Sequence, residues 1–198
     1  MHGSKDAEIV RHDGVRAVVL IGFMGAGKSS VGRVLGKYLG WAFEDLDERI
    51  ERREQRKVAD IFRESGESGF RRSEHAALKE LLSESRPGAE RIVALGGGAF
   101  VQKENAKLIE AGRIATVFLD ADVVELWRRC REQAGRQEVE RPLLGNLESF
   151  RKLYAARRSH YLKASFRQET MGKTVEEIAA ALVQALGIDR SPAGRGGK

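Results

Sequence analysis

The stretch Gly22-Phe23-Met24-Gly25-Ala26-Gly27-Lys28-Ser29 follows directly after the apolar run Ala17 to Ile21. It fills every fixed position of the pattern GxxxxGK[S/T]. In that pattern the glycines let the backbone wrap around a polyphosphate, the lysine reaches the outer phosphates and the hydroxyl holds Mg²⁺. Apolar side chains then recur at the spacing of one helix face, at Val31, Val34, Leu35, Tyr38 and Leu39. The sequence therefore predicts a phosphate-binding loop that ends at a helix N-terminus, where free amides and the helix dipole favour an anion.

A dinucleotide site is the alternative interpretation of the same loop. Gly25 and Gly27 begin the pattern GxGxxG, but Ser30 occupies the position of the third glycine. The isolated acidic residue that such a site uses about twenty positions further on is also missing, because the nearest carboxylates form a close pair. We therefore favour the phosphate-binding loop.

Length and composition predict one domain. The chain has 198 residues, of which 41% are hydrophobic, enough for one sizeable core. Residues 1–16 show little apolar periodicity and residues 189–198 are rich in Gly, Ser and Pro, so we expect a single domain over 17–188 between two flexible tails. The net charge of +6 suits a nucleotide and an acidic co-substrate. The arginine clusters lack interleaved aromatic residues, so no nucleic-acid partner is expected.

The location of the protein follows from cysteine content and hydropathy. Cys130 is the single cysteine and has no Cys or His at metal-binding spacing, which favours a reducing compartment. No apolar stretch approaches the roughly eighteen residues of a membrane-spanning helix, and the N-terminus lacks a signal pattern, so no membrane association is expected. We expect a cytoplasmic protein, and a monomer because the sequence shows no exposed apolar seam.

Strand-like apolar runs alternate with amphipathic helical segments, the pattern of an α/β fold with a parallel sheet between helices. We expect strands at 17–22, 42–45, 91–95, 114–119 and 165–169. The long interval after the second strand predicts inserted helices, at 47–55, 58–65 and 67–84. The later interval predicts a helix from about Asp122, a polar stretch at 132–140 that has the composition of a closing lid, a helix at 147–161 and a last helix that ends at Gly187.

The segment Phe43-Glu44-Asp45-Leu46-Asp47 brings two carboxylates to the end of the second strand. Strand alternation would put Asp45 and Asp47 on one side and Leu46 on the other. One carboxylate could help to hold Mg²⁺, because we find no apolar strand after residue 91 that ends in an aspartate. The other could orient an attacking hydroxyl and accept its proton. The alternative is that Asp47 caps the following helix.

Two further features carry possible chemistry. Arg71 and Glu74 stand one helical turn apart. They could form a surface ion pair, or Glu74 could fix the position of Arg71 so that its guanidinium binds a substrate carboxylate. The run Gly96-Gly97-Gly98 follows an apolar strand and so lies at the carboxyl edge of the sheet, where α/β proteins bind ligands. Three consecutive glycines indicate that another group approaches the backbone closely.

In this order the motifs resemble those of the shikimate kinase family, from about Val18 to Leu186. The matching segments are GFMGAGKSS (22–30), FEDLD (43–47), IFRESGESGFRRSE (61–74), LGGGAF (95–100), RPLL (141–144) and RRSHY (157–161). One motif alone identifies a P-loop kinase, whereas the ordered set is specific. The resemblance implies a three-layer αβα P-loop kinase fold with a five-stranded parallel sheet, a helical substrate-binding insertion at about 46–84 and a lid at about 130–146.

The resemblance also implies an enzyme that transfers the γ-phosphoryl group of ATP, with Mg²⁺, to the 3-hydroxyl of shikimate, a step of chorismate and aromatic amino-acid biosynthesis. The residues that it implies for ATP binding are Gly25, Ala26, Gly27, Lys28, Ser29, Ser30 and Arg141. Those implied for the metal are Ser29 and Asp45, and those implied for the substrate are Asp47, Arg71, Gly97, Gly98 and Arg157. Catalysis would depend on Lys28, Asp47 and Arg141.

The chain departs from the family pattern at three places. Ser30 replaces a common threonine, which should be harmless if Ser29 is the metal ligand. Ser159 stands where the motif RxPxY has proline, and the adjacent Arg158 is a rival to Arg157 for the substrate. The segment before Arg141 is a few residues longer than usual, so a second lid arginine could be any of three, Arg129, Arg131 or Arg136.

Two other functions are the alternatives. A gluconate kinase would share the phosphate-binding loop but should lack the combination of Asp47, the FR motif and the glycine run. A non-catalytic nucleotide-sensing module would keep the fold and lose the catalytic groups, which are present here.

Overall fold

The computed structural model describes residues 16–137 and 146–188. One sheet lies at its centre, with the strands in the order β2-β3-β1-β4-β5. The strands are β1 (Ala17–Ile21), β2 (Ala42–Asp45), β3 (Arg91–Ala94), β4 (Ala115–Asp120) and β5 (Phe166–Glu169). All neighbours pair in parallel, so every strand ends at the same edge of the sheet. The five predicted strands are confirmed, each within one residue at either end.

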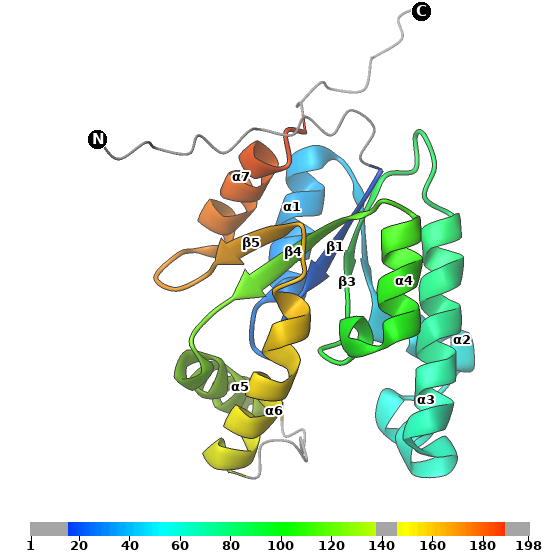
Figure 1. Cartoon of the computed structure of the whole chain (residues 1–198), viewed down its shortest axis with the longest axis vertical. Coiled ribbons are helices and arrows are strands. Elements are labelled where there is room, and N and C mark those ends of the chain that lie inside the picture. Colours follow the sequence, from blue (N-terminus) through cyan, green and yellow to red (C-terminus); the bar gives the residue numbers. More distant parts are fainter. Residues whose placement is uncertain (1–15, 138–145, 189–198) are drawn as a thin grey trace, which may run out of the picture.

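Helices cover both faces of this sheet, which confirms the three-layer α/β fold (Figure 1). On one face α1 (Lys28–Leu39) packs against α7 (Val175–Ala185). On the other, α3 (Val58–Ser83) contacts α4 (Lys103–Ala111) and the short 3-10 helix η1 (Ala99–Val101). The remaining helices are α2 (Leu46–Glu54), α5 (Val123–Gln137) and α6 (Leu147–Tyr161). None of the helices among the described residues is long and apolar enough to cross a bilayer.

The core lies between these layers. Every residue of β1 and of β4 is buried, because helices cover both faces of these central strands. The continuous apolar run Ala17 to Ile21 therefore has the composition that its position requires. Phe23, in the loop after β1, is also fully buried and packs edge-on against Phe150 of α6. The phosphate-binding loop is thus anchored in the core.

The inserted helices lie where the sequence predicts them, but two of them are joined. The helices predicted at 58–65 and 67–84 form one element, α3, which is interrupted at Gly66, whose φ of 67° and ψ of −179° are not helical. Glycine adopts a positive φ without the steric cost of a Cβ, so the break occurs at the residue between the two predicted helices.

The polar stretch predicted at 132–140 begins as helix rather than as a lid. Helix α5 continues into it as far as Gln137, and the rest of the predicted lid lies outside the described residues, as do 1–15 and 189–198.

A second expectation was wrong: β4 is an apolar strand after residue 91 that does end in an aspartate, Asp120. The carboxylate of Asp120 is described with the site.

Candidate active site at the carboxyl edge of the sheet

The glycine-rich loop joins β1 to α1 at the carboxyl edge. Gly22, Gly25 and Gly27 all have positive φ angles, of 147°, 79° and 85°. Gly27 is the N-cap of α1 and has no side chain with which to satisfy the first amides of the helix, so these remain available to an anion. The ammonium of Lys28 lies back over the loop and donates to the carbonyls of Gly22 and Phe23, each at 3.0 Å.

The loop also has a fixed contact with α5. A Cβ atom built on Gly25 would lie 2.7 Å from the carbonyl oxygen of Leu126 and 2.9 Å from the Sγ atom of Cys130. Both the positive φ and this contact require glycine at position 25. Helix α5, which leads into the predicted lid segment, is therefore packed directly against the phosphate-binding loop.

The two predicted metal ligands meet at the start of α1. Ser29 donates its hydroxyl to Asp45 Oδ2 at 2.6 Å. In the described part of the chain, no group of three or more His, Cys, Asp or Glu residues could hold a metal ion by itself. A hydroxyl beside a single carboxylate suits Mg²⁺, which keeps several waters and is held in kinases mainly through substrate phosphates. The donor set therefore fits the implied metal.

The helix cap is Asp45, so the alternative that Asp47 serves only to cap the helix does not hold. Helix α2 begins at Leu46, and Asp45 Oδ1 accepts the backbone amide of Asp47 at 3.1 Å. Strand β2 stops at Asp45 because this short side chain offers the backbone a local partner in place of the sheet. Asp47 accordingly lies in the first helical turn, and the strand alternation that we expected for it does not apply.

Asp47 and Lys28 perturb one another. Burial and, to a smaller extent, the nearby Asp45 raise the pKa of Asp47 to about 6, against the opposing effect of Lys28. Burial lowers the pKa of Lys28 to about 8, against the attraction of Asp47 and Asp45. A carboxylate that titrates near neutrality has the proton affinity that suits a general base.

Arg71 is held by a buried partner. Its Nη1 atom donates to both carboxylate oxygens of Glu74, at 3.1 and 2.9 Å, and its Nη2 atom donates to Glu67 at 3.1 Å. Glu74 is only 1% exposed, so the surface ion pair that the sequence left open was wrong. Burial raises the pKa of Glu74, and Arg71 opposes that change. The pair thus fixes the position of the guanidinium.

The glycine run is the surface on which the predicted substrate residues converge. A Cβ atom on Gly96 would lie 2.9 Å from Asp47 Oδ1, and one on Gly98 would lie 2.7 Å from Arg71 Nη2. A Cβ atom on Gly97 would lie 3.5 Å from the Nη1 atom of Arg157. Each glycine therefore faces a different one of the three side chains. Gly96 was missing from the predicted site, although its place in the run was the signal that could have found it.

The structure separates the two rival arginines of α6. Arg157 turns toward the glycine run, and its guanidinium lies 5.8 Å from the centroid of the Phe23 ring. Arg158 turns away and donates to Asp120 Oδ2 at 2.9 Å and to the Tyr154 hydroxyl at 3.1 Å.

Asp120, at the end of β4, does not join the carboxylate pair. Its side chain is 6% exposed and accepts from Arg158, Arg167 and Tyr154. Three donors from α6 and β5 therefore engage its charge.

The remaining predicted residues are less informative. Ala26 is buried and Ser30 is exposed in the first turn of α1. Among the candidate lid arginines, Arg129 is bound to Glu125 and to Thr170, the residue after β5, and Arg131 is exposed on α5. Arg141 and the side chain of Arg136 lie outside the described residues.

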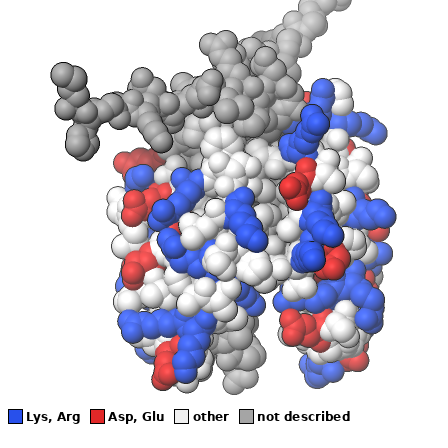
Figure 2. Space-filling view, in the orientation of Figure 1, with Lys and Arg blue, Asp and Glu red and all other residues white. Residues whose placement is uncertain are grey.

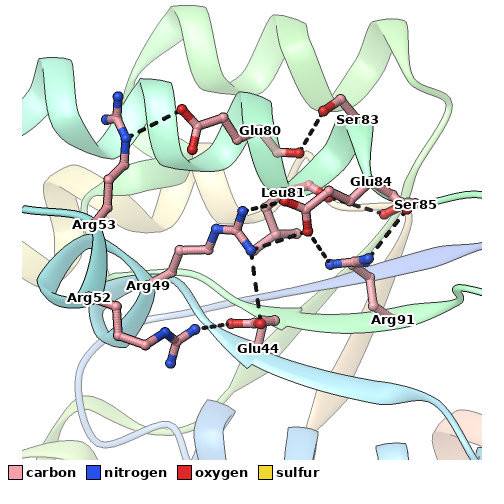
Figure 3. A network of polar contacts seen from close by, with 10 residues as sticks. All are labelled: Glu44, Arg49, Arg52, Arg53, Glu80, Leu81, Ser83, Glu84, Ser85 and Arg91. Carbon is pink, nitrogen blue, oxygen red and sulfur yellow. Dashed lines mark hydrogen bonds and ion pairs between the residues drawn. The ribbon is translucent and has the colours of Figure 1, made fainter.

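A network of ion pairs holds the helix that carries Asp47 (Figure 3). Arg49, on α2, donates to both carboxylate oxygens of Glu84 just after α3, and Arg91 of β3 donates to the same carboxylate at 3.0 Å. Arg52 donates to Glu44 of β2 at 2.6 Å. Single exposed pairs contribute little, whereas a bidentate pair shared with a third charge fixes geometry better. The network joins α2 to β2, to β3 and to the end of α3.

The side chains that face the glycine run come from two lobes of the molecule. The space-filling view shows a gap at the lower edge between the part formed by α5 and α6 and the part formed by α2 and α3 (Figures 1 and 2). Asp47 and Arg71 come from the second lobe, and Arg157 comes from the first. The side chains that the glycine run faces therefore come from both lobes.

Comparisons with known proteins agree with this geometry. A family model described as shikimate kinase matches residues 24–187. The shikimate kinase of Persephonella marina is 37% identical over 166 residues, which cover 83% of this chain and 94% of the relative. A solved structure of shikimate kinase from Acinetobacter baumannii, in complex with shikimate, superimposes with a TM-score of 0.75 at 31% identity, covering 86% of this chain and 92% of that one. A gluconokinase from Sinorhizobium meliloti superimposes with a TM-score of 0.55 at 20% identity over 87% of this chain and 91% of that one, which shows the fold alone.

Proposed function

The chain belongs to the shikimate kinase family, and from this premise we propose that it transfers the γ-phosphoryl group of ATP to the 3-hydroxyl of shikimate. Shikimate is a polyol with one carboxylate, so its enzyme needs cations for the carboxylate and a base for one hydroxyl. The site offers both, in a position next to the phosphate-binding loop. The reaction belongs to the biosynthesis of chorismate and the aromatic amino acids.

The convergence of three side chains on the glycine run carries the proposal. We assign Arg71 and Arg157 to the substrate carboxylate, because both are arginines whose planar guanidinium suits bidentate recognition. Glycine at 97 and 98 leaves room for the sugar-like ring against the backbone. Asp47 would then hold the hydroxyl that attacks and accept its proton, for which its pKa of about 6 is suitable.

Phosphoryl transfer needs positioning and charge stabilisation more than covalent chemistry. We assign the amides of Gly25 to Ser30 to the ATP phosphates, and Lys28 to the charge that develops on the transferred group. Lys28 would exchange its two carbonyl partners for phosphate oxygens as the nucleotide binds. Ser29 and Asp45 would hold Mg²⁺, which neutralises phosphate charge when it is bound. Arg141 would complete the charge stabilisation from the lid.

We further propose that the protein acts as a monomer in the cytoplasm. The assigned side chains that the structure describes meet within one chain, so no second copy is needed to form the acceptor site. A single buried cysteine suits a reducing compartment.

Measuring ADP release with Mg·ATP tests the proposal, with shikimate, gluconate and nucleoside monophosphates compared as acceptors. We expect stimulation by shikimate. Stimulation by gluconate alone would instead favour the gluconate kinase, and ATP binding without turnover on any acceptor would favour a nucleotide-sensing module. The variant Lys28→Ala should lower turnover at least about a hundredfold, while Lys37→Ala, at an exposed position of the same helix, should leave turnover unchanged.

A further inference from the structure

Two side chains outside the assigned site, one from α6 and one from α4, hold the backbone at residues 97–99. The hydroxyl of Tyr161 on α6 donates to the carbonyl of Gly97. Asn105 of α4 donates its Nδ2 atom to the carbonyl of Ala99 at 3.1 Å, and its Oδ1 atom accepts from His75 Nδ1 of α3 at 2.8 Å. Because the amide nitrogen of Asn105 is used by Ala99, its oxygen must face an N–H, which fixes His75 Nδ1 as the donor.

These contacts stand at matching positions relative to the two arginines. Tyr161 follows Arg157 by four residues on α6, and His75 follows Arg71 by four residues on α3. Residues four apart lie on the same face of a helix. The helix that carries each arginine is therefore held, one turn further on, to the backbone at residues 97–99, directly through Tyr161 on α6 and by way of Asn105 through His75 on α3.

Both hydrogen bonds to this backbone, from Tyr161 and from Asn105, are buried; we call these two contacts the ties. Tyr161 and Asn105 are each 1% exposed, so breaking either bond leaves a buried polar atom without its partner. Burial raises the pKa of Tyr161 to about 12, so its hydroxyl stays protonated as a donor at any assay pH. The backbone of the run is itself a series of tight turns, with the Ala99 amide bonded to the Gly96 carbonyl and the Val101 amide bonded to the Gly98 carbonyl.

Arg71 lies so close to the glycine run that a small movement of its helix would change the position of its guanidinium. Arg71 Nη2 already lies within 2.7 Å of the Cβ position of Gly98. A shift of α3 by a few tenths of an ångström would change where the guanidinium meets a bound carboxylate, and binding geometry of this kind is sensitive to such displacements.

We propose that His75, with Asn105, and Tyr161 are positioning residues that set the spacing of Arg71 and Arg157 across the glycine run, and so determine affinity for the carboxylate of the acceptor. This inference rests on the proposed roles of the two arginines. It assigns no contact between these positioning residues and the substrate.

The test separates a positioning role from a general structural one. His75→Leu removes the donor, whereas His75→Asn places an amide N–H near the position of Nδ1 and keeps it. Position 75 tolerates such changes because it borders a cavity of about 300 Å³. We expect His75→Leu and Tyr161→Phe each to raise KM for shikimate about tenfold, the size expected for loss of one hydrogen bond to a buried group. The KM for ATP and kcat should stay within about twofold, and His75→Asn should behave as wild type.

A double-mutant cycle gives the decisive readout. In an Arg71→Met background, where the carboxylate contact is already lost, His75→Leu should cause no further rise in the KM for shikimate. Glu104→Gln, which lines the same cavity without taking part in the tie, is the matched control. Equal effects on the KM for both substrates, failure of His75→Asn to rescue, or additive effects in the Arg71→Met background would overturn the inference. An unchanged KM in Arg71→Met itself would instead overturn the proposed role of Arg71, and the inference with it.

Discussion

The acidity of Asp47 gives the most discriminating prediction. The carboxylate must be ionised to accept a proton, so the acid limb of kcat/KM for shikimate should follow the pKa of Asp47 in the free enzyme. Burial and the neighbouring Asp45 raise that pKa to about 6. An unperturbed aspartate titrates near 3.9 and would give no acid limb in the usual assay range.

The size of the effect follows from these values. With a pKa of about 6, roughly a tenth of the carboxyl groups are ionised at pH 5, so kcat/KM should fall about tenfold between pH 7 and pH 5. An ordinary aspartate would lose less than about a tenth of its ionised form over the same interval. On the alkaline side, Lys28 with a pKa of about 8 predicts a similar tenfold loss near pH 9.

The assay is the rate of ADP formation at low, fixed Mg·ATP, from pH 4.5 to 9.5 at constant ionic strength. Mg·ATP also titrates, and Asp47→Asn provides the control, because a limb that belongs to the nucleotide persists in that variant and one that belongs to Asp47 disappears. Asp47 also raises the pKa of Lys28. The alkaline loss of Mg·ATP binding should therefore move to lower pH in Asp47→Asn. An acid midpoint below pH 5, or an acid limb unchanged in Asp47→Asn, would refute the assignment of Asp47 as the base.

Three further substitutions test the site. Gly98→Ala should raise the KM for shikimate about tenfold or more, because its methyl group would displace Arg71; steady-state kinetics that match wild type would contradict this. Arg158→Met should lower the free energy of unfolding by about 1 to 2 kcal/mol, because Asp120 loses one of its partners. The KM for shikimate should stay unchanged. Denaturant titration measures the first quantity and steady-state kinetics the second, and a raised KM would show that Arg158 belongs to the substrate site. Gly25→Ala should weaken Mg·ATP binding at least tenfold through its positive φ and its contact with α5, which calorimetry measures, and unaltered affinity would show that the loop adapts.

The sequence predicted the fold well because the signals involved are local. Strand β1 is an unbroken apolar run between a polar segment and a glycine-rich loop, and the sheet buries both of its faces. The break between the two inserted helices was visible because Gly66 separates two amphipathic segments. The kinked α3 and the parallel sheet therefore needed no knowledge of distant contacts.

The sequence left alternatives open where adjacent residues compete for one role. In Asp45-Leu46-Asp47 either aspartate has the chemistry of a helix cap, and the outcome depended on where β2 stopped pairing with β3. Arg157 and Arg158 are adjacent on α6 and point about 100° apart, so the rotation of the helix decides which one faces the glycine run. Arg157, the residue assigned from the sequence, is the one that does so.

Other features were invisible because they join distant parts of the chain. The two arginine partners of Asp120 lie 38 and 47 residues away, at Arg158 and Arg167, so the sequence could not show that its charge is engaged. The same holds for His75 and Asn105, which are 30 residues apart. Pairings of this kind depend on the packing of helices on the sheet, which the periodicity of each helix does not specify.

The raised pKa of the partly buried Asp47 has a consequence for anyone who evolves this protein in the laboratory. A carboxyl whose pKa is raised on folding destabilises the native state once the pH exceeds about 6, on the order of a few kcal/mol, and this penalty vanishes below about pH 4, where the group is protonated in both states. Libraries screened for heat resistance at neutral pH, without selection for turnover, would therefore enrich neutral replacements at this position and yield robust but inactive clones. Screening the same library under acidic conditions would remove that bias.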